Sequence, residues 1–109
     1  MITTNKIIGD HGEKLAQQPL KANGYKIIVR NYRYRRGEID IICMYQKTLI
    51  FVEVKTRKNN NFGYPETFVT PAQQKKIMDT ADHYIYETGW EENIRYDIIA
   101  ITKTDLVHF

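Results

Sequence analysis

Apolar and polar positions in this chain first follow a helical period. Residues 5–22 carry an apolar stripe that includes Leu15 and Ala16, and Gly24 follows the range, which together predict a helix. Pro19 lies within it, where a proline ring clashes with the carbonyl group four residues earlier. We therefore expect a kink or a break near Pro19.

The pattern then changes to segments rich in β-branched and aromatic residues, which predicts strands. These segments are residues 25–34, 38–45 and 48–57. Short connections at 36–37 and 46–47 separate them. We therefore expect three strands in an antiparallel meander.

A second helix is predicted after a polar connection at residues 58–69. Thr70 suits the N-cap position, Pro71 suits the first helical position, and Gln73 completes a capping box. Gly89 is the residue expected just beyond the C-terminus of a helix. A helix between residues 70 and 89 follows from these signals.

A fourth strand is predicted at residues 95–102. Because it follows a helix, it should run parallel to the strand at 48–57, which becomes central. The order α-β-β-β-α-β predicts a single α/β domain over residues 1–109, with a mixed four-stranded sheet flanked by helices on both faces.

Four charged residues are expected on one face of the hairpin between the second and third strands. If residues 46–47 form a two-residue loop, cross-strand partners have positions that sum to 93. Asp40 then pairs with Glu53, and Glu38 pairs with Lys55, with side chains about 5 Å apart. The other face would carry Ile39, Ile41, Val52 and Val54.

The pairing of Asp40 with Glu53 is informative because like charges directly opposed in a sheet are destabilising. A hard cation such as Mg²⁺, or Mn²⁺ in its place, would remove the conflict, with the backbone carbonyl of Val54 as a further ligand. Lys55 could then stabilise charge on a phosphate or orient an attacking water. The alternative is that Glu38 and Lys55 form an ordinary cross-strand ion pair with no metal.

Basic and aromatic residues are interleaved around the first turn. They are Arg30, Tyr32, Arg33, Tyr34, Arg35 and Arg36. With a net charge of +3 and a pI of about 9.0, this pattern suits contacts with phosphates and bases. It equally suits a solvated edge strand whose charges prevent aggregation.

The cysteine count, the apolar runs and the first residues of the chain indicate its cellular compartment. The single cysteine, Cys43, excludes an internal disulfide and indicates a reducing compartment. The longest apolar run, residues 41–45, is too short to span a bilayer, and residues 1–13 contain no secretory signal. We expect a cytoplasmic protein without a membrane partner.

Several ordered motifs resemble those of known nucleases. Residues 37–40 (GEID) and 51–57 (FVEVKTR) are similar to the signature of PD-(D/E)XK nucleases. Further matches at 12–16 (GEKLA), 23–25 (NGY) and 95–99 (RYDII) resemble the YraN family of predicted endonucleases, which is related to archaeal Holliday junction resolvases.

This resemblance implies a restriction-endonuclease-like fold and Mg²⁺-dependent hydrolysis of DNA, including branched junctions. It implies that Asp40 and Glu53 bind the metal, that Lys55 assists catalysis, and that Glu13 of the first helix is a further acidic member of the site. Symmetric cutting of junctions would need a homodimer. Asp97 is expected to pair with Arg95 rather than to bind metal.

Residues flanking the site would neutralise phosphates of the nucleic acid. They are Arg33, Arg35, Arg36, Arg57 and Lys58. Gln73 could also contact DNA, although its role as a cap already explains it. Two alternatives stay open: a nucleic-acid-binding module of this fold without catalytic activity, and a protein-interaction adaptor that uses the aromatic segments 62–64 and 84–86.

Overall fold

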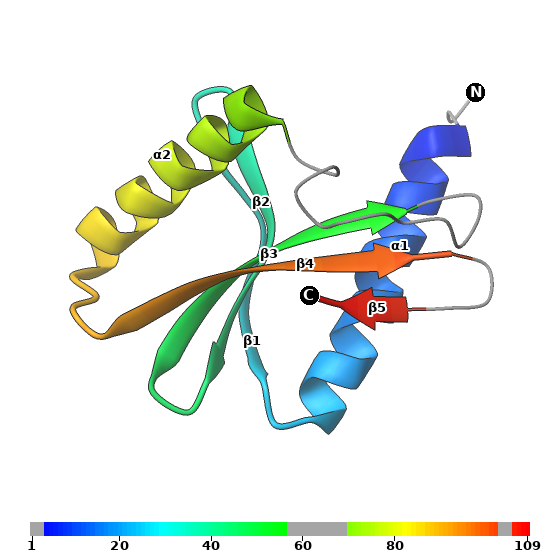
Figure 1. The fold of residues 1–109 in the computed structure, drawn as a ribbon, viewed down its shortest axis with the longest axis horizontal. Coiled ribbons are helices and arrows are strands. Elements are labelled where there is room, and N and C mark those ends of the chain that lie inside the picture. Colours follow the sequence, from blue (N-terminus) through cyan, green and yellow to red (C-terminus); the bar gives the residue numbers. More distant parts are fainter. Residues whose placement is uncertain (1–3, 57–69, 103–105) are drawn as a thin grey trace.

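The structure is a computed structural model that describes residues 4–56, 70–102 and 106–109, without the side chains of residues 4–11 and 13. Its elements follow one another along the chain as shown in Figure 1. They are α1 (Thr4–Ala22), β1 (Lys26–Tyr34), β2 (Gly37–Tyr45), β3 (Thr48–Thr56), α2 (Pro71–Thr88), β4 (Asn93–Ile101) and β5 (Leu106–His108).

The strands form one mixed sheet in the order β1-β2-β3-β4-β5. β1, β2 and β3 are antiparallel neighbours, and β3 pairs with β4 in parallel, as predicted. β3 is therefore central. The predicted number of four strands is wrong, because β5 pairs antiparallel with β4. A three-residue strand is too short to show an alternating pattern in sequence.

The two helices cover opposite faces of the sheet, as expected and as Figure 1 shows. Ala16 and Leu20 of α1 pack on a cluster that includes Ile41. Ala81 of α2 packs on a second cluster that includes Phe51. We refer below to the α1 side and the α2 side of the sheet.

The expected break at Pro19 does not occur, and α1 continues to Ala22. Proline removes one backbone donor, but Ala16 and Leu20 on either side of it are buried against the sheet, and this packing stabilises the helix through Pro19. The last carbonyl groups are satisfied by other donors. Asn23 donates from Nδ2 to the Pro19 carbonyl at 2.7 Å, and the Tyr25 N–H donates to the Leu20 carbonyl at 2.9 Å.

The predicted caps of α2 are confirmed. Thr70 Oγ1 accepts a hydrogen bond from the Gln73 N–H at 3.2 Å, and Gln73 Oε1 accepts one from the Thr70 N–H at 3.0 Å. Gly89 adopts a left-handed conformation with φ of 70°. These caps fix where α2 begins, next to the β2–β3 hairpin.

Gly37 brings α2 unusually close to the start of β2. A Cβ atom at this position would lie 2.0 Å from Thr80 Oγ1 and 2.9 Å from the Lys76 carbonyl oxygen. No side chain fits there, so glycine is required for this approach.

Two further expectations concern the burial of Cys43 and the absence of a membrane-spanning segment. Cys43 is a free thiol with no exposed surface, as predicted. Within the described residues, neither α1 nor α2 is long and apolar enough to cross a membrane.

Candidate active site

The β2–β3 hairpin has the predicted register near its turn. Cα partners run from Tyr45–Thr48 to Ile41–Val52. Gln46, the first residue of the loop, has φ of 54°, as tight hairpin turns require. The two-residue loop therefore sets the alignment on which the predicted site depends.

At Asp40 a side-chain hydrogen bond replaces the backbone pairing between β2 and β3. Asp40 Oδ2 accepts a hydrogen bond from the Val54 N–H at 2.7 Å. The recorded Cα pairs stop before Asp40, so the expected direct pairing of Asp40 with Glu53 is corrected to this side-chain contact. This hydrogen bond fixes the orientation of the Asp40 carboxylate and satisfies the Val54 N–H of the central strand.

The same irregularity reverses the side-chain alternation of β2. Ile39 packs with Phe51 on the α2 side, whereas Ile41 packs with Val52 and Val54 on the α1 side. Our prediction that Ile39 shares a face with Ile41 is therefore wrong. In a regular strand these residues would face the same way, so the break lies between them, at Asp40.

The carboxyl groups of Asp40 and Glu53 lie close enough to share a hydrogen bond. Burial, followed by the negative charge of Asp40, raises the pKa of Glu53 to about 8, and Lys55 opposes this rise. Burial also raises the pKa of Asp40, against the hydrogen bond from Val54. One proton is thus favoured between the two groups in the metal-free protein.

Lys55 completes the cluster. Its Nζ lies 3.5 Å from Glu53 Oε1, and the two side chains are 20% and 18% exposed. The structure therefore brings together Asp40, Glu53 and Lys55, as predicted from the sequence.

The raised pKa of Glu53 predicts that the metal-free protein loses stability as pH rises. Below its ordinary pKa of 4.5 the carboxyl group is protonated in both states. Between 4.5 and about 8 only the unfolded chain ionises, so the free energy of unfolding falls through this window and stays lower above it. We expect a loss of about 3 kcal/mol, from about 1.4 kcal/mol per pKa unit with an allowance for coupling.

Urea denaturation from about pH 5 to about pH 9 in EDTA would measure this loss. Glu53→Gln is the control, because it removes the titrating group and keeps the shape. Over the same pH range, the free energy of unfolding of the variant should lack the loss of about 3 kcal/mol that is expected for the wild type. Parallel curves for the two proteins would contradict the assignment.

A shallow depression of about 120 Å³ lies over Glu53 and Lys55 on the α2 side. It is lined by Arg36, Gly37, Glu38, Glu53, Lys55, Gln73, Lys76 and Ile77. Gln73 therefore borders the candidate site as well as capping α2. Arg36 also lines this depression.

The other predicted nucleic-acid contacts are placed differently. Arg33 donates from Nε to Glu38 at 2.9 Å, and its side chain is 74% exposed. The guanidinium of Arg35 lies 5.1 Å from the centre of the Tyr34 ring. Arg57 and Lys58 fall outside the described residues. Glu38 thus forms an ion pair with Arg33, and Lys55 forms one with Glu53.

Glu13 lies on α1, and the structure does not describe its side chain. A Cβ atom on the preceding Gly12 would lie 2.7 Å from Thr56 Oγ1, so α1 packs directly on the end of β3. Glu13 therefore starts from the α1 side of the sheet, whereas Glu53 and Lys55 line the depression on the α2 side.

The donor set suits a hard divalent cation. Magnesium sites commonly use one or two carboxylates with waters and substrate phosphates, and Asp40 with Glu53 supplies two carboxylates. The pKa values of both carboxyl groups are raised, so Lys55 and the Val54 N–H compensate their negative charges only in part. Among the side chains that the structure describes, no group of three His, Cys, Asp or Glu residues is arranged to hold a metal.

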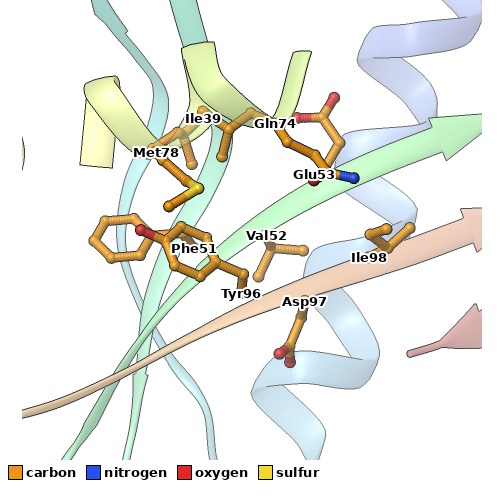
Figure 2. Close-up of a pocket in the computed structure, with 10 residues that line it drawn as sticks. Ile39, Phe51, Val52, Glu53, Gln74, Met78, Tyr96, Asp97 and Ile98 are labelled. Carbon is orange, nitrogen blue, oxygen red and sulfur yellow. The ribbon is translucent and has the colours of Figure 1, made fainter. Parts of the chain in front are cut away.

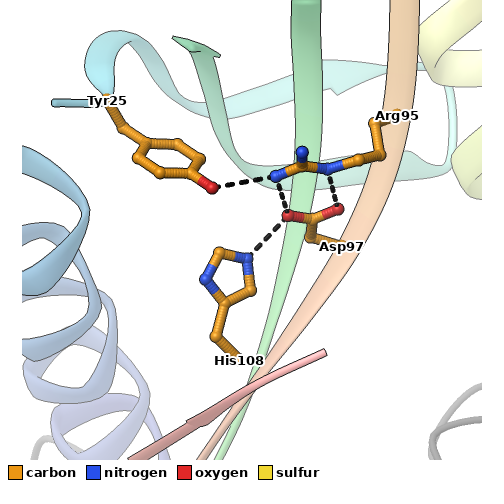
Figure 3. A network of polar contacts seen from close by, with 4 residues as sticks. All are labelled: Tyr25, Arg95, Asp97 and His108. Carbon is orange, nitrogen blue, oxygen red and sulfur yellow. Dashed lines mark hydrogen bonds and ion pairs between the residues drawn. The ribbon is translucent and has the colours of Figure 1, made fainter. Parts of the chain in front are cut away.

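A second polar cluster consists of Tyr25, Arg95, Asp97 and His108 (Figure 3). Asp97 accepts two hydrogen bonds from Arg95, both at 2.8 Å, which confirms the predicted pairing. His108 Nε2 lies 2.6 Å from Asp97 Oδ2, and Arg95 Nη2 lies 3.0 Å from the Tyr25 hydroxyl. The cluster thus ties β5 and the start of β1 to β4.

Sequence reasoning missed His108 because the terminal segment LVHF carries no recognisable motif. Asp97 is the register neighbour of Val52, which places it on the α1 side. Burial, followed by the charge of Asp97, raises the pKa of the Cys43 thiol to about 12, so the thiol stays neutral. The cluster is therefore structural and separate from the carboxylate pair.

Comparisons with known proteins identify the family. A family model described as "Uncharacterised protein family UPF0102" matches residues 12–101. A UPF0102 protein of Cytophaga hutchinsonii is 46% identical over 98 residues, which cover 90% of this chain and 87% of that protein. One of Prosthecochloris aestuarii is 50% identical over 95 residues, covering 86% and 75%. One of Clostridioides difficile is 45% identical over 98 residues, covering 89% and 86%. The chain therefore belongs to the UPF0102 family, the YraN-like family that the sequence motifs indicated.

Proposed function

We propose that this protein is a metal-dependent endonuclease with a restriction-endonuclease-like core, which hydrolyses phosphodiester bonds in DNA. The observation that carries the proposal is the contact between Asp40 and Glu53, with Lys55 Nζ 3.5 Å from Glu53. Burying two carboxyl groups against each other costs stability. A divalent cation bound by both carboxyl groups would offset that cost.

Different residues of the chain would bind the metal and stabilise the phosphate. Asp40, oriented by the Val54 N–H, and Glu53 would hold Mg²⁺ or Mn²⁺, with the Val54 carbonyl and Glu13 as further candidate ligands. When bound, such an ion polarises a phosphoryl oxygen and lowers the pKa of a bound water. Lys55 would stabilise charge that develops on the phosphate.

Basic side chains at the rim would position the nucleic acid. Arg36 and Lys76 line the same depression as Glu53, so they would neutralise phosphates next to the reacting one. Arg33, Arg35, Arg57, Lys58 and Gln73 are further candidate contacts. On a branched junction, two symmetric cuts need two sites, so we expect a homodimer on such a substrate.

Cleavage assays of the wild-type protein test this function. Labelled branched, flapped, single-stranded and duplex DNA should be cut with Mg²⁺ or Mn²⁺. EDTA should stop the reaction, because the carboxyl pair then has no cation to present to the phosphate. Gel analysis of the products would show whether cuts fall within the strand.

Binding without turnover would favour the alternative, a nucleic-acid-binding module of the same fold. In that case no substrate is cut with either metal, while affinity falls steeply with salt. Absence of salt-dependent affinity for any of the DNAs would favour the adaptor alternative instead.

A further inference from the structure

A second cavity adjoins the candidate active site, between α2 and strands β3 and β4 (Figure 2). Its volume is about 400 Å³, which is within the range of small-ligand pockets. It is lined by Ile39, Phe51, Val52, Glu53, Gln74, Ile77, Met78, Tyr96, Asp97 and Ile98. Figure 2 shows the carboxyl group of Asp97 directed away from the other lining side chains, toward its own partners on the α1 side. Nothing in the mechanism proposed above uses its apolar part.

The apolar part presents the ring of Tyr96 and the thioether of Met78, and the buried ring of Phe51 (1% exposed) lies against Tyr96. The rings of Phe51 and Tyr96 are stacked, with centroids 5.5 Å apart and planes inclined by 28° to each other. Figure 2 shows the sulfur of Met78 directed toward these two rings. The side chains of Met78 and Tyr96 are 51% and 42% exposed, so a ligand can reach them. Flat aromatic molecules bind well to such surfaces.

The other end of the cavity is polar. Figure 2 shows Gln74 beside Glu53, away from the aromatic rings. A glutamine amide has both donor and acceptor groups, as recognition of a base edge requires. Glu53 and Ile77 line this cavity and also the depression that contains Lys55, so the two spaces adjoin at these residues.

We propose that this cavity receives an unpaired nucleobase next to the phosphodiester bond held at Glu53 and Lys55. The inference rests on the proposed function and narrows its substrate to DNA with an unpaired nucleotide near the cut. A base inside a duplex must be unstacked and unpaired before it can enter such a pocket, whereas an unpaired base enters at little cost. The basic residues of the neighbouring depression favour a nucleotide over an uncharged aromatic ligand.

The test compares two DNA duplexes that differ at one position. One contains a single unpaired adenine, and the other contains an abasic analogue at the same place. Fluorescence anisotropy in EDTA measures binding without cleavage. We expect the wild-type protein to bind the adenine-containing duplex about tenfold more tightly, as base–aromatic stacking predicts.

Met78→Glu places a charge at the aromatic end of the cavity and should bring this ratio close to one. Tyr86→Glu is the matched control, because it makes the same charge change on α2 at a side chain that is 85% exposed and outside the cavity. The control should keep the tenfold ratio. Thermal melting of both variants verifies that they are folded.

Equal affinity of the wild-type protein for the two duplexes would overturn this inference, as would an unchanged ratio in Met78→Glu. These results are independent of cleavage. A protein that cuts DNA but does not distinguish base from abasic site loses only this inference. A protein that distinguishes them but never cuts loses the proposed catalysis and keeps the base pocket.

Discussion

Asp40→Asn and Glu53→Gln are each expected to slow metal-dependent DNA cleavage by at least about a thousandfold. An amide has the shape of the carboxyl group but no charge, so it binds a divalent cation weakly. Electrostatic stabilisation by a catalytic metal amounts to several kcal/mol, and each 1.36 kcal/mol corresponds to a factor of about ten in rate. Initial rates on the best wild-type substrate, at saturating Mn²⁺, would measure the effect.

Glu92→Gln is the matched control for these variants. Glu92 is exposed, lies between α2 and β4, and lines neither the depression nor the adjoining cavity. It should cleave DNA at the wild-type rate. Cleavage by Asp40→Asn at a rate near that of Glu92→Gln would remove the carboxylate pair from the mechanism.

Asp97→Ala is expected to lower the free energy of unfolding by about 3 kcal/mol. The Asp97 side chain is only 4% exposed and accepts hydrogen bonds from Arg95. His108 Nε2 lies 2.6 Å from its Oδ2. Removal of the Asp97 side chain leaves a guanidinium group without its anion, and breaking a buried pair in this way costs about 3–5 kcal/mol. The Arg95 side chain is 43% exposed, so water offsets part of the loss. Denaturation in urea would measure it.

Asp79→Ala is the control for Asp97→Ala. Its ion pair with Lys75 is exposed on both sides, and such pairs contribute about 0–1 kcal/mol. Because Asp97 lies on the α1 side, Asp97→Ala should still cleave DNA at temperatures where it is folded. Loss of cleavage by the folded variant would instead assign Asp97 to the active site.

Local signals made much of this fold predictable. Thr70, Gln73 and Gly89 act through contacts within a few residues, so the ends of α2 could be inferred without knowledge of the tertiary structure. The two-residue loop at 46–47 fixed the hairpin register in the same way, and with it the approach of Asp40 to Glu53.

Features that depend on tertiary contacts were not predictable. The pairing of β2 with β3 ends at Ile41, the Val54 N–H donates to the Asp40 side chain instead, and Ile39 lies on the α2 side, although the sequence alternates regularly there. β5 is held by pairing with β4 and by the contact of His108 with Asp97, and neither leaves a periodic pattern. In both cases a long-range partner determines the local geometry.

The absence of a side chain at Gly37 determines how wide the candidate active site is. α2 rests against the backbone of β2 at this point, and the same helix carries Gln73 and Lys76 to the edge of the depression that Glu53 and Lys55 line. A methyl group at position 37 would act as a wedge and tilt these residues away from the hairpin. The width of the depression is therefore governed by a position that has no functional group of its own.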